Sequence, residues 1–286
     1  MTQSAIDCWK VRILLPKQEA MALAVCLENL DTSPVVSAFE FGERGLWEVE
    51  AFFGDAPDPA FLQEATGYEL AVTAVPSADW VTIALDGLPP VRVGRFYVHG
   101  KHARAARPPN TLGLEIEAST AFGTGHHGTT RGCLLALELL ARTHGPQKVL
   151  DLGCGTGILA FAAAKLRHAR TIATDIDPVA AAKAREFSRL NAVHPYVKTG
   201  TAAGIKGPLS LADRPYDLIF ANILMRPLMQ LMPSIARCVR PGGHAILSGL
   251  LNHQERAIMA VAAPWRLTFV RRHRLDGWVT LTLRRV

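Results

Sequence analysis

The sequence predicts an α/β protein in which a doubly wound, mainly parallel sheet follows a smaller N-terminal α+β domain. Three observations lead to this prediction. The chain has 286 residues, enough for one large domain or two modest ones. Its second part alternates short strands with helices, which is typical of a parallel sheet covered on both faces. Its first part has a different element order and the opposite net charge.

The N-terminal part is expected to have the order β-α-β-β-α-β, the ferredoxin-like arrangement. Proline and glycine separate the apolar runs, and Asp58 followed by Pro59 is a typical start of a helix. The strands are expected at Trp9–Leu15, Val35–Phe41, Leu46–Phe53 and Tyr68–Val75. The helices are expected at Lys17–Leu30 and from Pro59 to about Thr66.

The C-terminal part alternates branched, strand-like runs with helical ones and ends in a hairpin. The parallel strands are expected at Val149–Leu152, Thr171–Asp175, Tyr216–Ala221 and His244–Leu247. The helices are expected at Leu159–Leu166, Pro178–Asn191 and Pro227–Cys238. Leu267–Arg272 and Gly277–Leu283 should form an antiparallel pair at the end of the sheet.

Charge also divides the chain. Residues 1–95 hold 6 basic and 14 acidic side chains, a formal charge of −8, and residues 96–286 hold 25 and 11, a charge of +14. We therefore predict a domain at 1–84 that recognises substrate, a linker at 85–95, and a catalytic domain at 96–286. The acidic part favours a basic protein partner and makes direct binding of nucleic acid unexpected.

Composition excludes several classes of protein. Hydrophobic residues make up 49% of the chain and charged residues 20%, which excludes disorder over most of its length. No apolar stretch approaches the roughly 20 residues of a membrane helix, and no secretory signal is recognisable. The five cysteines are scattered without a C-x-x-C pair. We expect a cytoplasmic protein with neither a disulfide framework nor a metal site.

The strongest motif is KVLDLGCGTG, residues 148–157, in which a buried strand runs into Gly153, Gly155 and Gly157. Such glycines let the backbone turn tightly and approach a ligand at a helix N-terminus. The spacing differs from the G-x-G-x-x-G of dinucleotide-binding proteins. The next strand ends at Asp175, which we interpret as a ligand of ribose hydroxyls. We interpret Asp177, directly before Pro178, as a helix cap.

A second motif is AFGTGHHGTT, residues 121–130. Its three glycines suggest a loop that closes over a ligand, and Thr129 and Thr130 could cap the helix that follows. The adjacent histidines, His126 and His127, lack a third ligand at metal spacing, so we expect no metal there.

A third motif is DLIFANILMRPL, residues 217–228, which places Asn222 at the end of the fourth sheet strand. Enzymes that bind a planar amide or base at such a strand end typically have Asn-Pro-Pro-Tyr there. Here Asn222 is followed by Ile223-Leu224-Met225, which argues against a planar amide or base as the substrate group and leaves an aliphatic amine plausible.

Together, the glycine turn and Asp175 resemble class I S-adenosylmethionine-dependent methyltransferases. With FGTGHHGTT, DIDP, NIL and PGGHAILSG in this order after an acidic βαββαβ domain, nearly the whole chain resembles the ribosomal protein L11 methyltransferase family. The resemblance implies a class I, Rossmann-like catalytic domain and methyl transfer to lysine ε-amines and the N-terminal α-amine of a basic ribosomal protein. It implies that four residues contact S-adenosylmethionine, namely Thr130, Gly153, Asp175 and Asn222, and we add Gly155 from the same turn.

For catalysis, Asn222 is expected to accept a hydrogen bond from a neutral acceptor amine and direct its lone pair toward the methyl group. The enzyme mainly aligns donor and acceptor in an in-line displacement, and no dedicated base is required. Two alternatives remain open: another protein substrate, such as an electron-transfer flavoprotein subunit, or RNA bound by the basic part.

Overall fold

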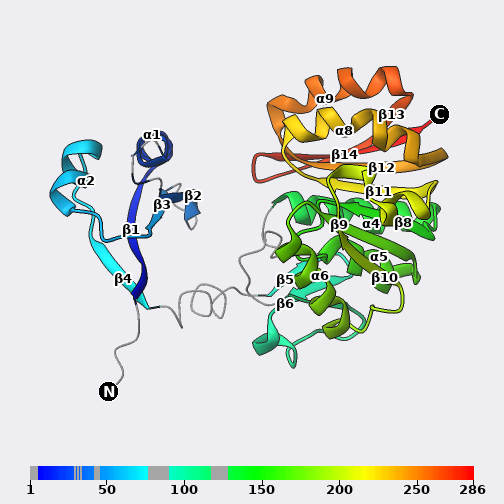
Figure 1. Cartoon of the computed structure of the whole chain (residues 1–286), viewed down its shortest axis with the longest axis horizontal. Coiled ribbons are helices and arrows are strands. Elements are labelled where there is room, and N and C mark those ends of the chain that lie inside the picture. The colour runs from blue at the N-terminus through cyan, green and yellow to red at the C-terminus, as the bar shows by residue number, and fades with distance from the viewer. Residues whose placement is uncertain are drawn as a thin grey trace. The chain divides into compact units, whose positions relative to one another are not determined.

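The structure, a computed structural model, describes residues 6–28, 30, 32, 34–41, 46–76, 90–116 and 128–286. The chain divides into two compact units, Met1–Ala84 and Leu85–Val286 (Figure 1). Within the described parts of the chain, no helix is long and apolar enough to cross a bilayer.

The N-terminal unit has the predicted β-α-β-β-α-β order. Its elements are β1 (Ile6–Pro16), α1 (Lys17–Glu28), β2 (Val35–Phe41), β3 (Leu46–Phe53), α2 (Pro59–Thr66) and β4 (Val72–Pro76). The strands pair antiparallel in the order β2-β3-β1-β4. Alternate residues of β3, Val49, Ala51 and Phe53, pack with Leu23 and Leu27 of α1, because side chains of a strand point to opposite faces in turn.

The prediction for the last strand of this unit is wrong at its start. Residues 68–71 are not part of β4, which pairs with β1 only from Val72. The chain first leaves α2 through Gly67, whose φ of 75° is left-handed. The Tyr68 hydroxyl then donates to Glu19 of α1 at 3.1 Å, and Leu70 is buried. The apolar pattern of this segment therefore reflects the burial of Leu70 and the contact of Tyr68 with α1, not strand pairing.

The second unit begins with three strands that the sequence did not predict. These are β5 (Val91–Val93), β6 (Phe96–His99) and β7 (Leu112–Glu115), which form a small sheet in that order. The linker expected at 85–95 is thus wrong for its last residues, because β5 pairs antiparallel with β6 and Val93 is buried. A 3-10 helix, η2 (Lys101–Ala103), lies between β6 and β7.

The main sheet has seven strands in the order β10-β9-β8-β11-β12-β14-β13. The first five are parallel, β14 pairs antiparallel with β12, and β13 pairs antiparallel with β14. The antiparallel pair of β13 and β14 at the end of the sheet is as predicted. Its strands are β8 (Lys148–Leu152), β9 (Arg170–Asp175), β10 (Val197–Thr201), β11 (Tyr216–Asn222), β12 (Val239–Leu251), β13 (Leu267–Leu275) and β14 (Trp278–Arg285). Strand β10 was not predicted, because the polar sequence VKTGT lacks an apolar pattern.

Helices cover both faces of this sheet (Figure 1). They are α4 (Gly128–Thr143), α5 (Ile158–Arg167), α6 (Pro178–Leu190), α7 (Pro208–Ala212), α8 (Met225–Cys238) and α9 (Glu255–Ala262), with 3-10 helices η3 (Gly204–Lys206), η4 (Asn252–Gln254) and η5 (Ala263–Trp265). Strand β11 is buried on both sides: Leu218 and Phe220 join the core of α4, α5 and α6. Ile219 and Ala221 join the core of α8 and α9. The central positions of a strand that is covered on both faces are all apolar, as residues 218–221 are here.

At the amino-terminal edge of the sheet, Asp217 connects three strands. Its carboxylate accepts the backbone N–H groups of Gln147 and Lys148 at 2.8 and 2.9 Å and the Nε–H of Arg240 at 2.6 Å. Burial on its own would raise the pKa of Asp217, but these hydrogen bonds and the Arg240 charge outweigh it and lower the pKa.

We predict that Asp217→Asn destabilises the fold by about 1 kcal/mol at neutral pH, because hydrogen bonds to a partly exposed charged group are lost. The folded-state pKa lies below the unfolded value of about 3.9, so the contribution is complete above that value and disappears as the pH falls through the folded-state pKa. Denaturant midpoints of both proteins, measured from neutral to acidic pH, should therefore converge in acid. A difference that persists unchanged in acid would contradict this role.

Candidate functional site

Three chain segments meet at the carboxyl edge of the main sheet. The glycine turn follows β8, Asp175 ends β9 and Asn222 ends β11. Strand β8 lies between β9 and β11, so the chain continues from β8 to β9 and β10 on one side of it and then to β11 and β12 on the other side. Such a switch in strand order leaves a crevice at the carboxyl ends of the strands, where open α/β sheets bind ligands.

The glycine turn is fixed to the neighbouring strand. The N–H groups of Gly153 and Cys154 both donate to the Thr174 carbonyl, at 2.8 and 3.0 Å. Gly153 has a φ of 68°, and a Cβ there would lie 2.5 Å from Ile223. No other residue fits this left-handed conformation and close contact without strain. The turn thus fixes the start of α5 at the carboxyl edge of the sheet.

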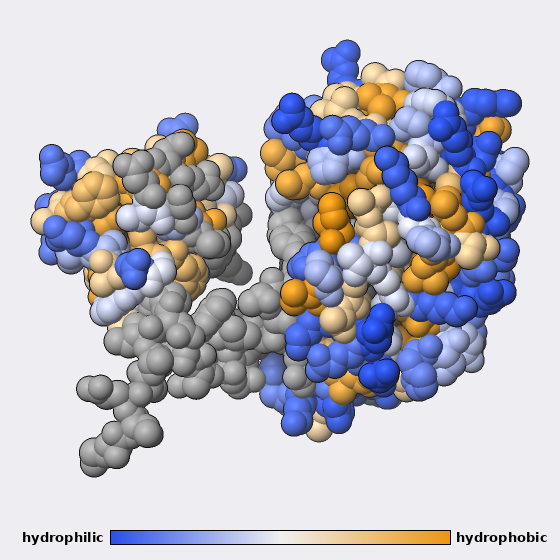
Figure 2. Space-filling view, viewed as in Figure 1, coloured by the Kyte–Doolittle hydropathy of each residue, from blue (hydrophilic) through white to orange (hydrophobic). Residues whose placement is uncertain are grey.

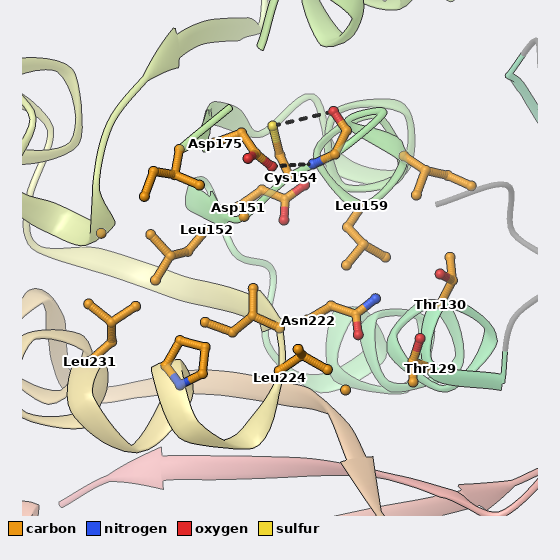
Figure 3. A pocket seen from close by; sticks show the side chains of 18 of the residues that line it. Thr129, Thr130, Asp151, Leu152, Cys154, Leu159, Asp175, Asn222, Leu224 and Leu231 are labelled. Atoms are coloured by element: carbon orange, nitrogen blue, oxygen red, sulfur yellow. Dashed lines mark hydrogen bonds between the residues drawn. The ribbon is translucent and has the colours of Figure 1, made fainter. Parts of the chain in front are cut away.

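Asp175 lies where the sequence predicts it, at the end of β9, with its carboxylate beside the glycine turn (Figure 3). One oxygen accepts the Gly155 N–H at 2.8 Å and the other accepts the Asp177 N–H at 3.0 Å. Each carboxylate oxygen keeps a further lone pair for a ligand. The prediction for Asp177 is confirmed: it caps α6 by accepting the Val179 N–H, with Pro178 at the first helical position.

A cavity of about 690 Å³ joins these segments. All five residues predicted to contact the cofactor line it: Thr130, Gly153, Gly155, Asp175 and Asn222. Its volume lies in the range of small-molecule sites, about 300–1,000 Å³. Figure 3 shows Asp175 and Cys154 on one side of the cavity and Asn222 with the two threonines of α4 on the other.

Two buried oxygen atoms in this cavity lack hydrogen-bond partners among the described residues. They are the Thr130 hydroxyl oxygen and the Asn222 amide oxygen. Unsatisfied buried oxygens are rare in proteins and costly, so each such group calls for an explanation. A polar ligand that donates hydrogen bonds to both would remove this cost.

The expected capping role of Thr129 and Thr130 is wrong. Helix α4 begins at Gly128, so both threonines lie inside its first turn and are buried. The Thr129 carbonyl accepts a hydrogen bond from Ser248 of β12 at 3.3 Å, which ties the helix start to the sheet. Thr130 is consequently held at the cavity wall. His126, His127 and the rest of the predicted lid up to residue 127 lie outside the described residues.

Asp151 is a cavity residue that the sequence analysis did not select. It is buried, and its carboxylate accepts the Ala160 N–H at 3.0 Å, across the glycine turn from β8 to α5. Burial raises the pKa of Asp151 to about 7, and the nearby Asp175 carboxylate contributes to the rise, against the effect of the Ala160 hydrogen bond. Its signal in the sequence was a lone acidic residue in an otherwise apolar buried strand, KVLDL.

The apolar walls of the cavity were also not predicted. They include Ile176, Leu224, Leu231 and Trp278, which come from three separate parts of the chain. Nothing in their local sequence marks them, because apolar residues at such positions are equally typical of a core. Among the described residues, no group of three or more His, Cys, Asp or Glu side chains could hold a metal ion.

Comparison with known proteins identifies the family. A family model described as ribosomal protein L11 methyltransferase (PrmA) matches residues 10–286. Proteins named ribosomal protein L11 methyltransferase from Bradyrhizobium diazoefficiens and Caulobacter sp. (strain K31) are 47% and 44% identical, covering 88% and 94% of this chain and 88% and 95% of their own. A crystal structure of ribosomal protein L11 methylase from Lactobacillus delbrueckii subsp. bulgaricus matches with a TM-score of 0.60 and 26% identity, over 70% of this chain and all of that one. This chain belongs to the ribosomal protein L11 methyltransferase family.

Proposed function

We propose that this protein transfers methyl groups from S-adenosylmethionine to lysine ε-amines and the N-terminal α-amine of ribosomal protein L11. The observation that carries the proposal is the cavity that joins Asp175 and the glycine turn to Asn222, in a chain of this family.

The residues of the cavity suit S-adenosylmethionine. The Asp175 carboxylate would accept hydrogen bonds from the two ribose hydroxyls, and Gly153 and Gly155 let the backbone approach the ligand. The apolar wall that includes Ile176 would cover the adenine. The two unsatisfied oxygens offer acceptors for N–H groups: Thr130 for the amino-acid part of the cofactor and Asn222 for the acceptor amine.

S-adenosylmethionine supplies a methyl group that is electrophilic because its sulfur is positively charged. In the proposed transfer, the lone pair of the acceptor nitrogen would form the new N–C bond, and the C–S electrons would remain with sulfur. Asn222 accepts a hydrogen bond from the amine and so directs that lone pair, which is a contribution of alignment. The amine must first lose its proton, and desolvation in an apolar cavity lowers a lysine pKa from its usual value of about 10.4.

The charge of the N-terminal unit supports a role in substrate recognition. Several acidic residues on and around α2 are exposed: Asp55, Asp58, Glu64 and Glu69. Exposed carboxylates attract a basic protein over a distance of about one Debye length, roughly 8 Å at physiological salt. We propose that residues 1–84 capture and orient the ribosomal protein, whereas residues 96–286 perform the transfer.

We predict that Asp175→Ala weakens S-adenosylmethionine binding by about 1.5–3 kcal/mol, or roughly 10- to 150-fold in Kd. Calorimetric titration of the purified variant measures this. Asp177→Ala is the matched control: it removes a carboxylate two residues away that caps α6 and does not line the cavity. It should lower stability and leave the affinity within about twofold. Equal affinities of all three proteins would exclude a ligand role for Asp175.

We predict that Asn222→Ala lowers kcat for methylation of ribosomal protein L11 about 10- to 100-fold, since one hydrogen bond that orients the amine is lost. S-adenosylmethionine binding should change much less. Asn191→Ala provides the comparison, because Asn191 is a buried asparagine that bonds to Glu115 and Lys165 away from the cavity. That variant should melt at a lower temperature with kcat retained. A normal kcat in Asn222→Ala would remove the proposed alignment role.

We predict that the double variant Glu64→Lys, Glu69→Lys raises KM for ribosomal protein L11 several-fold, with a larger effect at low salt. The Kd for S-adenosylmethionine should stay constant. Glu186→Lys, which changes an exposed carboxylate of α6 in the other unit, is the control. Running the assay with and without RNase, on tritiated cofactor, separates a protein substrate from RNA. If both charge variants affect KM equally, the acidic unit has no special part in recognition.

A further inference from the structure

A second cavity, of about 460 Å³, adjoins the first. The two share part of their walls: Leu224, Gly249 and Trp278 line both. Asp175 and the glycine turn line only the first. The second cavity therefore extends the site on the side of Asn222, which precedes Leu224 by two residues at the end of β11.

The rest of the second cavity is formed mainly by flexible apolar side chains. Met225 and Met229 come from the first turns of α8, and Leu251 ends β12. Arg226 and Gln254 supply its polar atoms. Methionine is unbranched and polarisable, so a wall of methionines adapts to side chains of different shape.

Exposed apolar surface accompanies this cavity. Leu224 is 70% exposed and Leu251 is 37% exposed. Figure 2 shows apolar areas among charged side chains on the viewed face of the larger unit. Apolar surface that stays in contact with water costs free energy, and a contiguous patch beside a site typically marks a place where a partner binds.

From this arrangement we infer that the second cavity binds the apolar side chain of a residue next to the acceptor lysine of the substrate. Met225, Met229 and Leu251 thereby determine specificity. The inference rests on the proposed function, because it assigns the occupant of the same site. If the amine of a substrate lysine reaches Asn222, the residues next to that lysine in the substrate lie near Leu224, which lines both cavities. An apolar neighbour would bury the methionines, whereas a basic one would lose hydration beside the like charge of Arg226.

Photocrosslinking tests the inference directly. p-Benzoylphenylalanine at position 229 of the full-length enzyme should crosslink to ribosomal protein L11 within a few residues of a methylated lysine, as mapped by mass spectrometry. The same group at Phe269, an exposed residue of the edge strand β13, is the control. Crosslinks from position 229 to distant parts of the substrate, or to the enzyme itself, would overturn the assignment.

A pair of variants gives an independent readout. Met229→Glu places a charge in the cavity and should raise KM for ribosomal protein L11 at least about tenfold, the scale of discrimination by an apolar pocket. Met229→Leu preserves the apolar wall and should stay near the wild-type value. Both should bind S-adenosylmethionine normally, which shows that they are folded. If Met229→Glu has the wild-type KM, the inference is wrong but the proposed function stands. If the wild-type enzyme does not methylate the ribosomal protein, the proposed function itself is wrong.

Discussion

Parallel pairing of β8 with β9 and β11 fixes where the site residues lie along the strands. Leu152, the last residue of β8, pairs with Thr174 on one side and Ala221 on the other. Asp175 and Asn222 are the next residues of their strands, so both lie one step beyond the point where β8 gives way to the glycine turn. A shift of either strand by one residue would turn its side chain to the opposite face. The cavity therefore depends on register before it depends on any single contact.

Backbone hydrogen bonds then hold the turn in place. The Thr174 carbonyl accepts two N–H groups of the turn and the Asp175 carboxylate accepts a third. These contacts leave the turn little freedom, so a ligand meets a prearranged surface and less conformational entropy is lost on binding. Asp151 braces the same turn from its inner side through the Ala160 N–H. Burial raises the pKa of Asp151 to about 7, because the ionised carboxylate loses its hydration in this interior.

The site retains groups that a purely structural core would not contain. The Thr130 and Asn222 oxygens are buried without partners among the described residues, and an unsatisfied buried acceptor costs about 1–3 kcal/mol. The exposed Leu224 and the methionines of α8 add apolar surface in contact with solvent. Both features are unfavourable for the unliganded protein, and the proposed binding of a polar cofactor and of an apolar substrate segment would remove both costs.

The sequence by itself determined the element order of the N-terminal unit, the alternation of strands and helices in the second unit, and the central motif of the site. Alternating apolar runs and proline or glycine boundaries marked β2, β3 and α2 to the residue, because local burial and capping decide these elements. Glycine spacing and a carboxylate at the next strand end located one side of the cavity. Strands β5, β6, β7 and β10 were missed, since short or polar strands are stabilised by their pairing partners.

Only the tertiary structure showed that the predicted residues share one cavity, and that Asp151 and Trp278 line it with them. Thr130, Asp151, Asn222 and Trp278 are far apart in sequence, and strand order and register bring them together. It also showed that Thr130 lies inside α4, and that part of the predicted linker belongs to a sheet. The physical reason is common to these cases: burial and partner choice are properties of contacts between distant segments, and the local sequence that we used to predict elements contains no record of those contacts.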